Sequence, residues 1–230
     1  MSRRGQGALD LSADRARALQ LTPVSVETQL RLDVFVALLL HWQRKINLVA
    51  QSTLPLLWTR HIADSLQLVP LAPQARVWVD FGSGAGFPGV PIACALAENT
   101  ETTVHLVESN GKKAAFLREV ARELKLRAEI HGMRAEIFGD SWKGRADAVT
   151  ARALAPLNTL CNQARPLIAR GAVGLFLKGQ DVGAELTEAA KYWTVQAERV
   201  PSRTDPAASV VIVRDLKPKT NRRRSEPDLP

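Results

Sequence analysis

The sequence predicts an α/β fold with a mostly parallel, seven-stranded sheet, an N-terminal helical lobe and a C-terminal antiparallel hairpin. Three observations carry this prediction: helical periodicity through the first 70 residues, short β-type runs alternating with helical stretches after Pro73, and two final β-type runs with no helix between them. Strands that alternate with helices are typical of βαβ crossovers, which build parallel sheets.

The N-terminal lobe is expected over residues 9–72. Between Ser25 and Val49 apolar residues recur every three or four positions, which predicts a long, largely buried helix with Ser25 as its N-cap. Its predicted buried stripe is Leu30, Val34, Ala37, Leu38 and His41, widened by Leu32, Phe35, Leu39, Trp42 and Ile46. A second helix is expected from about Thr53 until the prolines at 70 and 73 stop it.

The sheet is expected within residues 73–216. The predicted strands are 76–81, 102–108, 127–131, 146–150 and 172–178, followed by a hairpin of 193–200 and 209–216. The turn-rich segment 201–206 joins the last two runs, so we expect them to pair antiparallel at one end of the sheet. Residues 1–8 and 217–230 are polar and charged, and we expect both to be mobile.

Composition excludes several classes of protein. The chain has 230 residues, of which 46% are hydrophobic and 23% charged, so a disordered or collagen-like chain is excluded. The longest apolar runs, 34–40 and 90–97, are far shorter than the roughly 20 residues of a membrane span. The first ten residues lack the apolar stretch of a secretory signal, and two cysteines make no disulfide framework. We therefore expect a cytoplasmic protein without a membrane partner.

The charge points to a polyanionic partner. The formal net charge is +8, and residues 217–230 hold five basic side chains against two acidic ones. Binding to phosphates releases counterions, and this electrostatic contribution dominates non-specific affinity for nucleic acids. The alternative is that the charge reflects an arginine-rich composition alone.

A glycine-rich loop predicts the cofactor site. The segment Val79–Gly89 (VDFGSGAGFPG) follows a predicted strand, and its glycines at 82, 84 and 86 let the backbone turn tightly and approach a ligand. A dinucleotide-binding loop reads G-x-G-x-x-G, but here Phe87 stands where the third glycine belongs. Asp80 at the strand end would repel a pyrophosphate and attract a cation. The pattern favours S-adenosylmethionine, which carries a sulfonium and an ammonium group.

A second acidic residue supports a nucleoside cofactor. Glu108 ends the next predicted strand, 26 positions after Gly82, where a carboxylate can accept hydrogen bonds from both ribose hydroxyls. Taken singly, Asp80 could be a helix cap and Glu108 a solvated strand end. Two other classes of protein compete with a methyltransferase: a nicotinamide-dependent oxidoreductase, disfavoured by the displaced glycine and Asp80, and an RNA-binding module with an inactive pocket, disfavoured by the intact loop.

Several short segments together resemble a known family. They are 47–49 (NLV), 60–65 (RHIADS), 80–91 (DFGSGAGFPGVP), 108–109 (ES), 112–117 (KKAAFL), 134–136 (RAE), 151–157 (ARALAPL), 178–180 (KGQ) and 185–186 (EL). From about Val26 to Asp215 the chain resembles the small-subunit ribosomal RNA guanine-N7 methyltransferases (RsmG, also called glucose-inhibited division protein B). The family's usual Asn-Leu-Thr and Ser-Arg-Ala read NLV and ARA here. The resemblance implies a Rossmann-like class I S-adenosylmethionine-dependent methyltransferase fold.

The resemblance also implies roles for single residues. It implies that Gly82 and Phe87 line the cofactor, Glu108 holds its ribose, Ala135 and Glu136 flank the adenine, and Arg152 lies between cofactor and substrate as the catalytic residue. The glycine-rich loop itself indicates that Asp80, Gly84 and Gly86 also belong to the cofactor site. The implied substrate is 16S ribosomal RNA, alone or in the small ribosomal subunit, at the decoding-region loop.

The candidate substrate-binding residues are all basic. They are Arg60, His61, Lys178, Arg222, Arg223 and Arg224. Within a predicted helix, Arg60, His61 and Asp64 could cap the cleft or pin the lobe to the sheet, and for His61 the pinning role is favoured.

The motifs of two other methylation chemistries are absent. Amino-nitrogen methylation generally uses a polar-Pro-Pro-aromatic loop after the fourth strand, where this chain reads ARAL. Carbon-5 methylation of pyrimidines needs a cysteine nucleophile, but Cys94 and Cys161 fall on predicted apolar helix faces. Guanine N7 has a free lone pair and needs positioning but no general base. This is consistent with N7 as acceptor, although the atom itself is implied mainly by the resemblance.

Neither a metal nor a partner subunit is expected from the sequence. The four histidines show no paired ligand spacing, and the two cysteines lie 67 residues apart. We therefore expect no metal. The protein is expected to be a monomer, although no sequence pattern bears on its oligomeric state.

Overall fold

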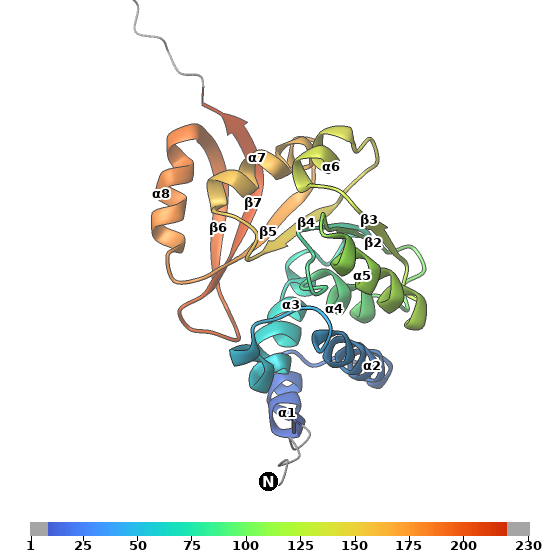
Figure 1. The fold of residues 1–230 in the computed structure, drawn as a ribbon. Coiled ribbons are helices and arrows are strands. Elements are labelled where there is room, and N and C mark those ends of the chain that lie inside the picture. The colour runs from blue at the N-terminus through green and yellow to red at the C-terminus, as the bar shows by residue number, and fades with distance from the viewer. Residues whose placement is uncertain (1–8, 220–230) are drawn as a thin grey trace, which may run out of the picture.

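The fold is built on one seven-stranded sheet. The computed structural model describes residues 9–219, and the strand order is β3-β2-β1-β4-β5-β7-β6 (Figure 1). The strands are β1 (Val77–Phe81), β2 (Thr103–Val107), β3 (Ala128–His131), β4 (Ala148–Arg152), β5 (Val173–Lys178), β6 (Trp193–Pro201) and β7 (Ser209–Pro218). All neighbours from β3 to β5 pair parallel, whereas β7 pairs antiparallel with both β5 and β6. The predicted parallel sheet and terminal hairpin are therefore confirmed.

The last strand is longer than the sequence predicts. Lys217 and Pro218, expected in a mobile tail, pair with Thr194 and Trp193 of β6. The backbone N–H of Lys219 then donates to the carbonyl of Tyr192 at 2.7 Å. The chain therefore stays hydrogen-bonded to the sheet edge as far as it is described.

Helices cover both faces of the sheet (Figure 1). They are α4 (Gly89–Ala95) and α5 (Gly111–Glu123) on one face, and α6 (Ala135–Ser141), α7 (Leu157–Ile168) and α8 (Val182–Tyr192) on the other. Successive side chains of β1 alternate between the two cores, since Trp78 packs with the first set of helices and Phe81 with the second. Cys94 and Cys161 are buried, one in each core, as the sequence predicts.

The N-terminal lobe packs against the face that carries α4 and α5. It contains α1 (Ser12–Leu21), α2 (Val26–Gln43), the 3-10 helix η1 (Gln51–Leu56), the π-helix η2 (Trp58–Ala63), α3 (Asp64–Leu66) and the 3-10 turn η3 (Val69–Leu71). The buried Asp14 carboxylate on α1 accepts the backbone N–H of Trp58 at 2.7 Å and the hydroxyl of Thr59 at 2.5 Å. Asp14 therefore satisfies donors that the start of the π-helix leaves free. No helix within residues 9–219 combines the length and apolar character needed to cross a membrane.

The long helix α2 forms where it is predicted, but its buried face differs from the predicted one. Ser25 caps it by accepting the N–H of Thr28 at 3.2 Å. The buried apolar residues are Leu32, Phe35, Val36 and Leu39, whereas Leu30 is 61% exposed and Val34 46% exposed. The widening residues Leu32, Phe35 and Leu39 are buried as predicted, but the centre of the predicted stripe was wrong. Apolar residues surround most of this helix, so periodicity alone does not single out the face that packs.

Candidate active site

The glycine loop between β1 and α4 needs left-handed backbone. Gly82, Gly84 and Gly86 all have positive φ, at 64°, 57° and 92°. A Cβ on Gly82 would lie 2.5 Å from Cδ1 of Leu154, so that side chain lies directly against the loop. A Cβ on Gly84 would meet only the carbonyl of Gly82, at 3.6 Å, and Gly84 lines a pocket. The loop therefore presents bare backbone to that pocket, as the sequence predicts for a ligand that must come close.

Asp80 lies beneath the loop. It is 1% exposed, its Oδ2 accepts the N–H of Gly89 at 3.1 Å, and its Oδ1 accepts the hydroxyl of Thr150 at 2.9 Å. Burial raises the pKa of Asp80 to about 7, although its hydrogen bonds and the charge of Arg152 act in the opposite direction. Asp80 therefore ties the loop to β4, and it is not among the residues that line the pocket beside Gly84.

Glu108 lies at the end of β2 and joins the loop to the same pocket. Its Oε2 accepts the N–H of Gly84 at 2.8 Å, and its Oε1 accepts the N–H of Asn110 at 2.7 Å. Each carboxylate oxygen can accept a further hydrogen bond. The sequence predicts a ribose contact here, and the geometry leaves acceptor capacity for one.

The first pocket, which we call the loop pocket, has a volume of about 310 Å³. Its walls include Gly82, Gly84, Glu108, Ala135 and Glu136, five of the predicted cofactor residues, together with Leu154 and Gln163. The other four predicted cofactor residues, Asp80, Gly86, Phe87 and Arg152, lie outside this pocket. Gly86 turns the loop toward α4, and the buried Phe87 ring faces the lobe, 4.9 Å from the ring of His61.

Gln163 of α7 lines the loop pocket and was missed by the sequence analysis. Its side-chain amide donates to Glu136 Oε1 at 2.6 Å, while its carbonyl oxygen is buried and has no hydrogen-bond partner within residues 9–219. The Glu136 pKa is lowered first by the residue's own backbone N–H and then by Gln163. One sequence feature could have identified Gln163: it is a polar residue three positions after Leu160 and four before Leu167, on an otherwise apolar face of the helix.

A second pocket, of about 280 Å³, adjoins the first at Ala153. We call it the lobe pocket, because the lobe supplies Arg60 and Asp64 to its wall. The remaining lining residues are Arg152, Leu177, Lys178, Gly179, Glu185, Thr204, Asp205 and Ala208. Ala153 has a positive φ of 50°, in the left-handed region that non-glycine residues rarely adopt.

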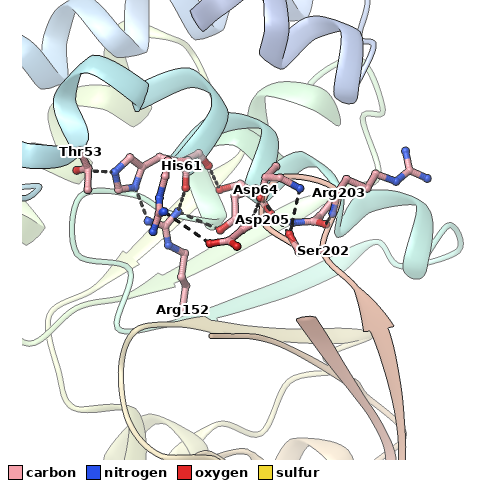
Figure 2. A network of polar contacts seen from close by, with 11 residues as sticks. Thr53, His61, Asp64, Arg152, Ser202, Arg203 and Asp205 are labelled. Atoms are coloured by element: carbon pink, nitrogen blue, oxygen red, sulfur yellow. Dashed lines mark hydrogen bonds and ion pairs between the residues drawn. The ribbon is translucent and has the colours of Figure 1, made fainter. Parts of the chain in front are cut away.

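Arg152, at the end of β4, reaches into the lobe (Figure 2). Its guanidinium donates to the carbonyl of Arg60 at 2.9 Å, lies 3.4 Å from Asp64 Oδ2 and contacts His61 Nδ1. It also lies over the ring of Phe87, 5.6 Å from the centroid. The catalytic residue implied by the resemblance is thus held in one orientation by the π-helix.

His61 is neutral in this arrangement. An arginine can only donate, so Nδ1 of His61 is an acceptor and Nε2 carries the proton that goes to Thr53 Oγ1, 3.0 Å away (Figure 2). Burial first, and then the charges of Arg152 and Arg60, lower the His61 pKa to about 3. His61 is buried, so its place matches the pinning role and not a contact with substrate.

The turn between β6 and β7 closes the far side of the lobe pocket. Thr204 donates its hydroxyl to Asp64 Oδ1 at 2.8 Å, and Asp205 lies 3.6 Å from the guanidinium of Arg60. Arg203 donates its backbone N–H to Gln67 at 2.9 Å (Figure 2). These contacts join segments about 140 residues apart, and no local sequence pattern indicates them.

The predicted substrate-binding residues differ in their freedom to bind. The Arg60 side chain is 53% exposed at the rim of the lobe pocket. Lys178 also lines that pocket, but its ammonium lies 2.6 Å from Glu185 Oε2 and donates to the carbonyl of Ala155 at 3.0 Å. The predicted contacts Arg222, Arg223 and Arg224 lie outside the described residues.

Comparison with known proteins decides the family. The model of the GidB family, rRNA small subunit methyltransferase G, matches residues 28–209. The chain belongs to this family. Among its curated relatives, the ribosomal RNA small subunit methyltransferase G of Bradyrhizobium sp. (strain BTAi1) is 58% identical over 203 residues, covering 88% of this chain and 91% of that protein. The one from Rhodopseudomonas palustris (strain BisB18) is 56% identical over 212 residues, covering 91% and 89%.

Solved structures support the methyltransferase fold of this rRNA small subunit methyltransferase G family member. Cofactor-bound Rv0187 from MTB gives a TM-score of 0.58 at 16% identity, covering 89% of this chain and 97% of that one. A protein from Klebsiella pneumoniae described as an O-methyltransferase gives 0.57 at 13% identity, covering 88% and 96%. The range that matches the family includes both pockets and every predicted site residue from Arg60 to Lys178.

Proposed function

We propose that this chain transfers the methyl group of S-adenosylmethionine to N7 of a guanine in 16S ribosomal RNA, in the decoding-region loop of the small subunit. Membership in a family of rRNA methyltransferases supports the reaction class. The observation that carries the site assignment is that the loop pocket and the lobe pocket meet at Ala153. A methyl donor in the first pocket and an acceptor base in the second would face each other across the end of β4.

The loop pocket fits the cofactor on three counts. Bare backbone at Gly84 allows close approach, Glu108 retains acceptor capacity for ribose hydroxyls, and the unpartnered carbonyl of Gln163 would accept the exocyclic amine of an adenine between Ala135 and Glu136. When bound, S-adenosylmethionine supplies an electrophilic methyl group. Asp80 would act indirectly, by holding the loop from below.

Within residues 9–219, the two potential bases that contact Arg152, His61 and Asp64, are both engaged. Nδ1 of His61 accepts from Arg152 and Nε2 carries a proton, so this imidazole has no lone pair to spare. Both oxygens of Asp64 are engaged, one by the hydroxyl of Thr204 and the amide of Gln67 and the other by Arg152. An acceptor such as guanine N7, which attacks through a lone pair and loses no proton, suits this arrangement.

Arg152 would orient the substrate. A guanidinium directed at a ring that becomes positive during methyl transfer would be unfavourable, so we assign its donors to guanine O6 or a phosphate. Arg60 at the rim, with the basic residues at 222–224 of the sequence, would bind RNA phosphates. We further propose that the protein acts as a monomer in the cytoplasm.

The proposal is tested by mapping N7-methylguanine by primer extension on 16S RNA incubated with the protein and cofactor. Naked RNA and isolated small subunits serve as parallel substrates. We expect one modified guanine in the decoding-region loop with the wild-type chain. We expect none with Gly84→Val, in which a branched side chain enters the loop pocket. Methylation at another atom, or equal activity of a folded Gly84→Val variant, would contradict the proposal.

A further inference from the structure

Two histidines and a glutamate meet at the free edge of the sheet. His105 lies on β2 and pairs across the ladder with Glu129 of β3, and His131 follows Glu129 by two positions. Residues two apart on a strand share a face, so all three side chains lie on the same side of the sheet. The chain spacing of 24 and two residues gave no sign of this cluster, because the strand pairing creates it.

The ligand atoms have metal-site separations. Nδ1 of His105 lies 3.1 Å from Nε2 of His131 and 3.5 Å from Oε2 of Glu129, and all three atoms lie within 4.8 Å of one another. In a tetrahedral zinc site with bonds of about 2.0–2.1 Å, neighbouring ligand atoms are about 3.3 Å apart. We propose that His105, Glu129 and His131 bind a transition-metal ion, with Zn²⁺ as the best match.

The ligand set and its surroundings suit this assignment. Two imidazoles and one carboxylate form a three-residue set that leaves a fourth position for water, and Glu129 is 63% exposed, so that position faces solvent. On the other side the rings of Trp142 and Phe138 lie 4.5 Å from His105 and 4.8 Å from His131. This aromatic packing fixes the two imidazoles before a metal arrives, which lowers the entropic cost of binding.

The site adjoins the loop pocket but contains none of its lining residues. The carbonyl of His131 accepts the N–H of Glu108 at 3.0 Å. Shortly after His131 the chain reaches Met133 and Ala135, and these two residues line the loop pocket. A metal that cross-links β2 and β3 here would hold one wall of the loop pocket in place. The three ligands would bind a metal whether or not the protein methylates guanine N7.

The alternative is a plain hydrogen bond between the two imidazoles, which also fits a separation of 3.1 Å. Metal binding distinguishes the two arrangements. The full-length chain without an affinity tag is dialysed against Zn²⁺ and, separately, titrated with Co²⁺, whose visible absorption reports tetrahedral coordination. Cys94 and Cys161 are buried in the cores and would not compete.

We expect about one equivalent of bound metal and tetrahedral Co²⁺ bands for the wild-type chain. The His105→Gln and His131→Gln variants should lose at least about a hundredfold in affinity, and Glu129→Gln at least about tenfold. His41→Gln is the matched control, because His41 is exposed on α2, away from the sheet edge, and its removal should change nothing. Zn²⁺ should also raise the melting temperature of wild type and of the control only.

Three results would overturn the site: no metal bound by the wild-type chain, unchanged affinity in the ligand variants, or equal loss in His41→Gln. If a histidine variant fails to fold by circular dichroism, Glu129→Gln decides, since its exposed side chain is dispensable for packing.

Discussion

Replacing Arg152 by alanine should weaken both the fold and the reaction, and the two effects can be separated. The Arg152 and Asp64 side chains are only 18% and 16% exposed, so removing the guanidinium strands a largely buried carboxylate. Breaking a fully buried pair costs about 3–5 kcal/mol. Asp64 keeps its hydrogen bonds from Thr204 and Gln67, so we expect a smaller loss, about 1–3 kcal/mol in the free energy of unfolding.

The double variant Arg152→Ala/Asp64→Asn removes the stranded charge and should recover most of that stability. It should not recover methyl transfer, because no guanidinium remains to orient the base. The assay is urea unfolding of wild type, both single variants and the double variant, together with single-turnover methylation of 16S RNA at saturating cofactor and substrate. The unfolding free energies of these four proteins form a double-mutant cycle for the ion pair, and the methylation rates show whether activity follows stability.

Two outcomes would refute this reasoning. If the double variant methylates at the wild-type rate, Arg152 serves only to pin the lobe. If Arg152→Ala unfolds at the wild-type urea concentration, the ion pair with Asp64 does not contribute to stability and the guanidinium is free to move.

Three further substitutions test the glycine loop and the residues that hold it. Gly82→Ala should lower the free energy of unfolding, measured with urea, by at least about 1–2 kcal/mol, because residue 82 has a left-handed φ. The loss should be larger still because the new Cβ would collide with Leu154. Unchanged stability would contradict this geometry. Glu108→Gln places an amide donor opposite one of the two backbone N–H groups that Glu108 now accepts. It should weaken cofactor binding, measured by isothermal titration, by about 1–3 kcal/mol. A loss of only a few tenths of a kcal/mol would show that the ribose binds elsewhere. The folded-state pKa of Asp80 is raised from 3.8 to about 7, so the stability linked to this carboxyl is fully present below pH 4 and is lost as the pH rises to about 7. The free energy of unfolding of the wild-type protein should therefore decline between pH 4 and 7, and Asp80→Asn should remove up to about 4 kcal/mol of that decline, at 1.36 kcal/mol per pKa unit. Urea unfolding across this pH range measures the effect. An identical slope in both proteins would show that Asp80 is ionised throughout.

The strands were predictable because their signal is local. Each is a run of apolar and β-branched residues between turn or helix signals, and the βαβ alternation then dictates parallel pairing. The packing face of α2 was not predictable. Leu30 and Leu32 are equally apolar, and only the position of the helix against Phe116 and Phe87 decides which of them is buried.

Within the site, too, features encoded by a few consecutive residues were predictable and features set by tertiary packing were not. The glycine loop and Glu108 were predictable because a tight turn and a carboxylate at a strand end leave their mark in a few consecutive residues. Gln163, Thr204 and Asp205 acquire their positions from helix packing and from the hairpin, so no local pattern identifies them. The cluster of His105, Glu129 and His131 likewise depends on the register between two strands.

Ala153 explains how one short segment serves both pockets. In an extended strand, Arg152 and Leu154 would point to the same face of the sheet. Here Arg152 reaches the lobe while Leu154 lies against Gly82, and the residue between them has a φ of 50°. That conformation costs a non-glycine residue about 1–2 kcal/mol, because its Cβ comes too close to the following carbonyl oxygen. The strain persists because the ion pair on one side and the loop contact on the other fix both neighbours, and it lies where methyl donor and acceptor would meet.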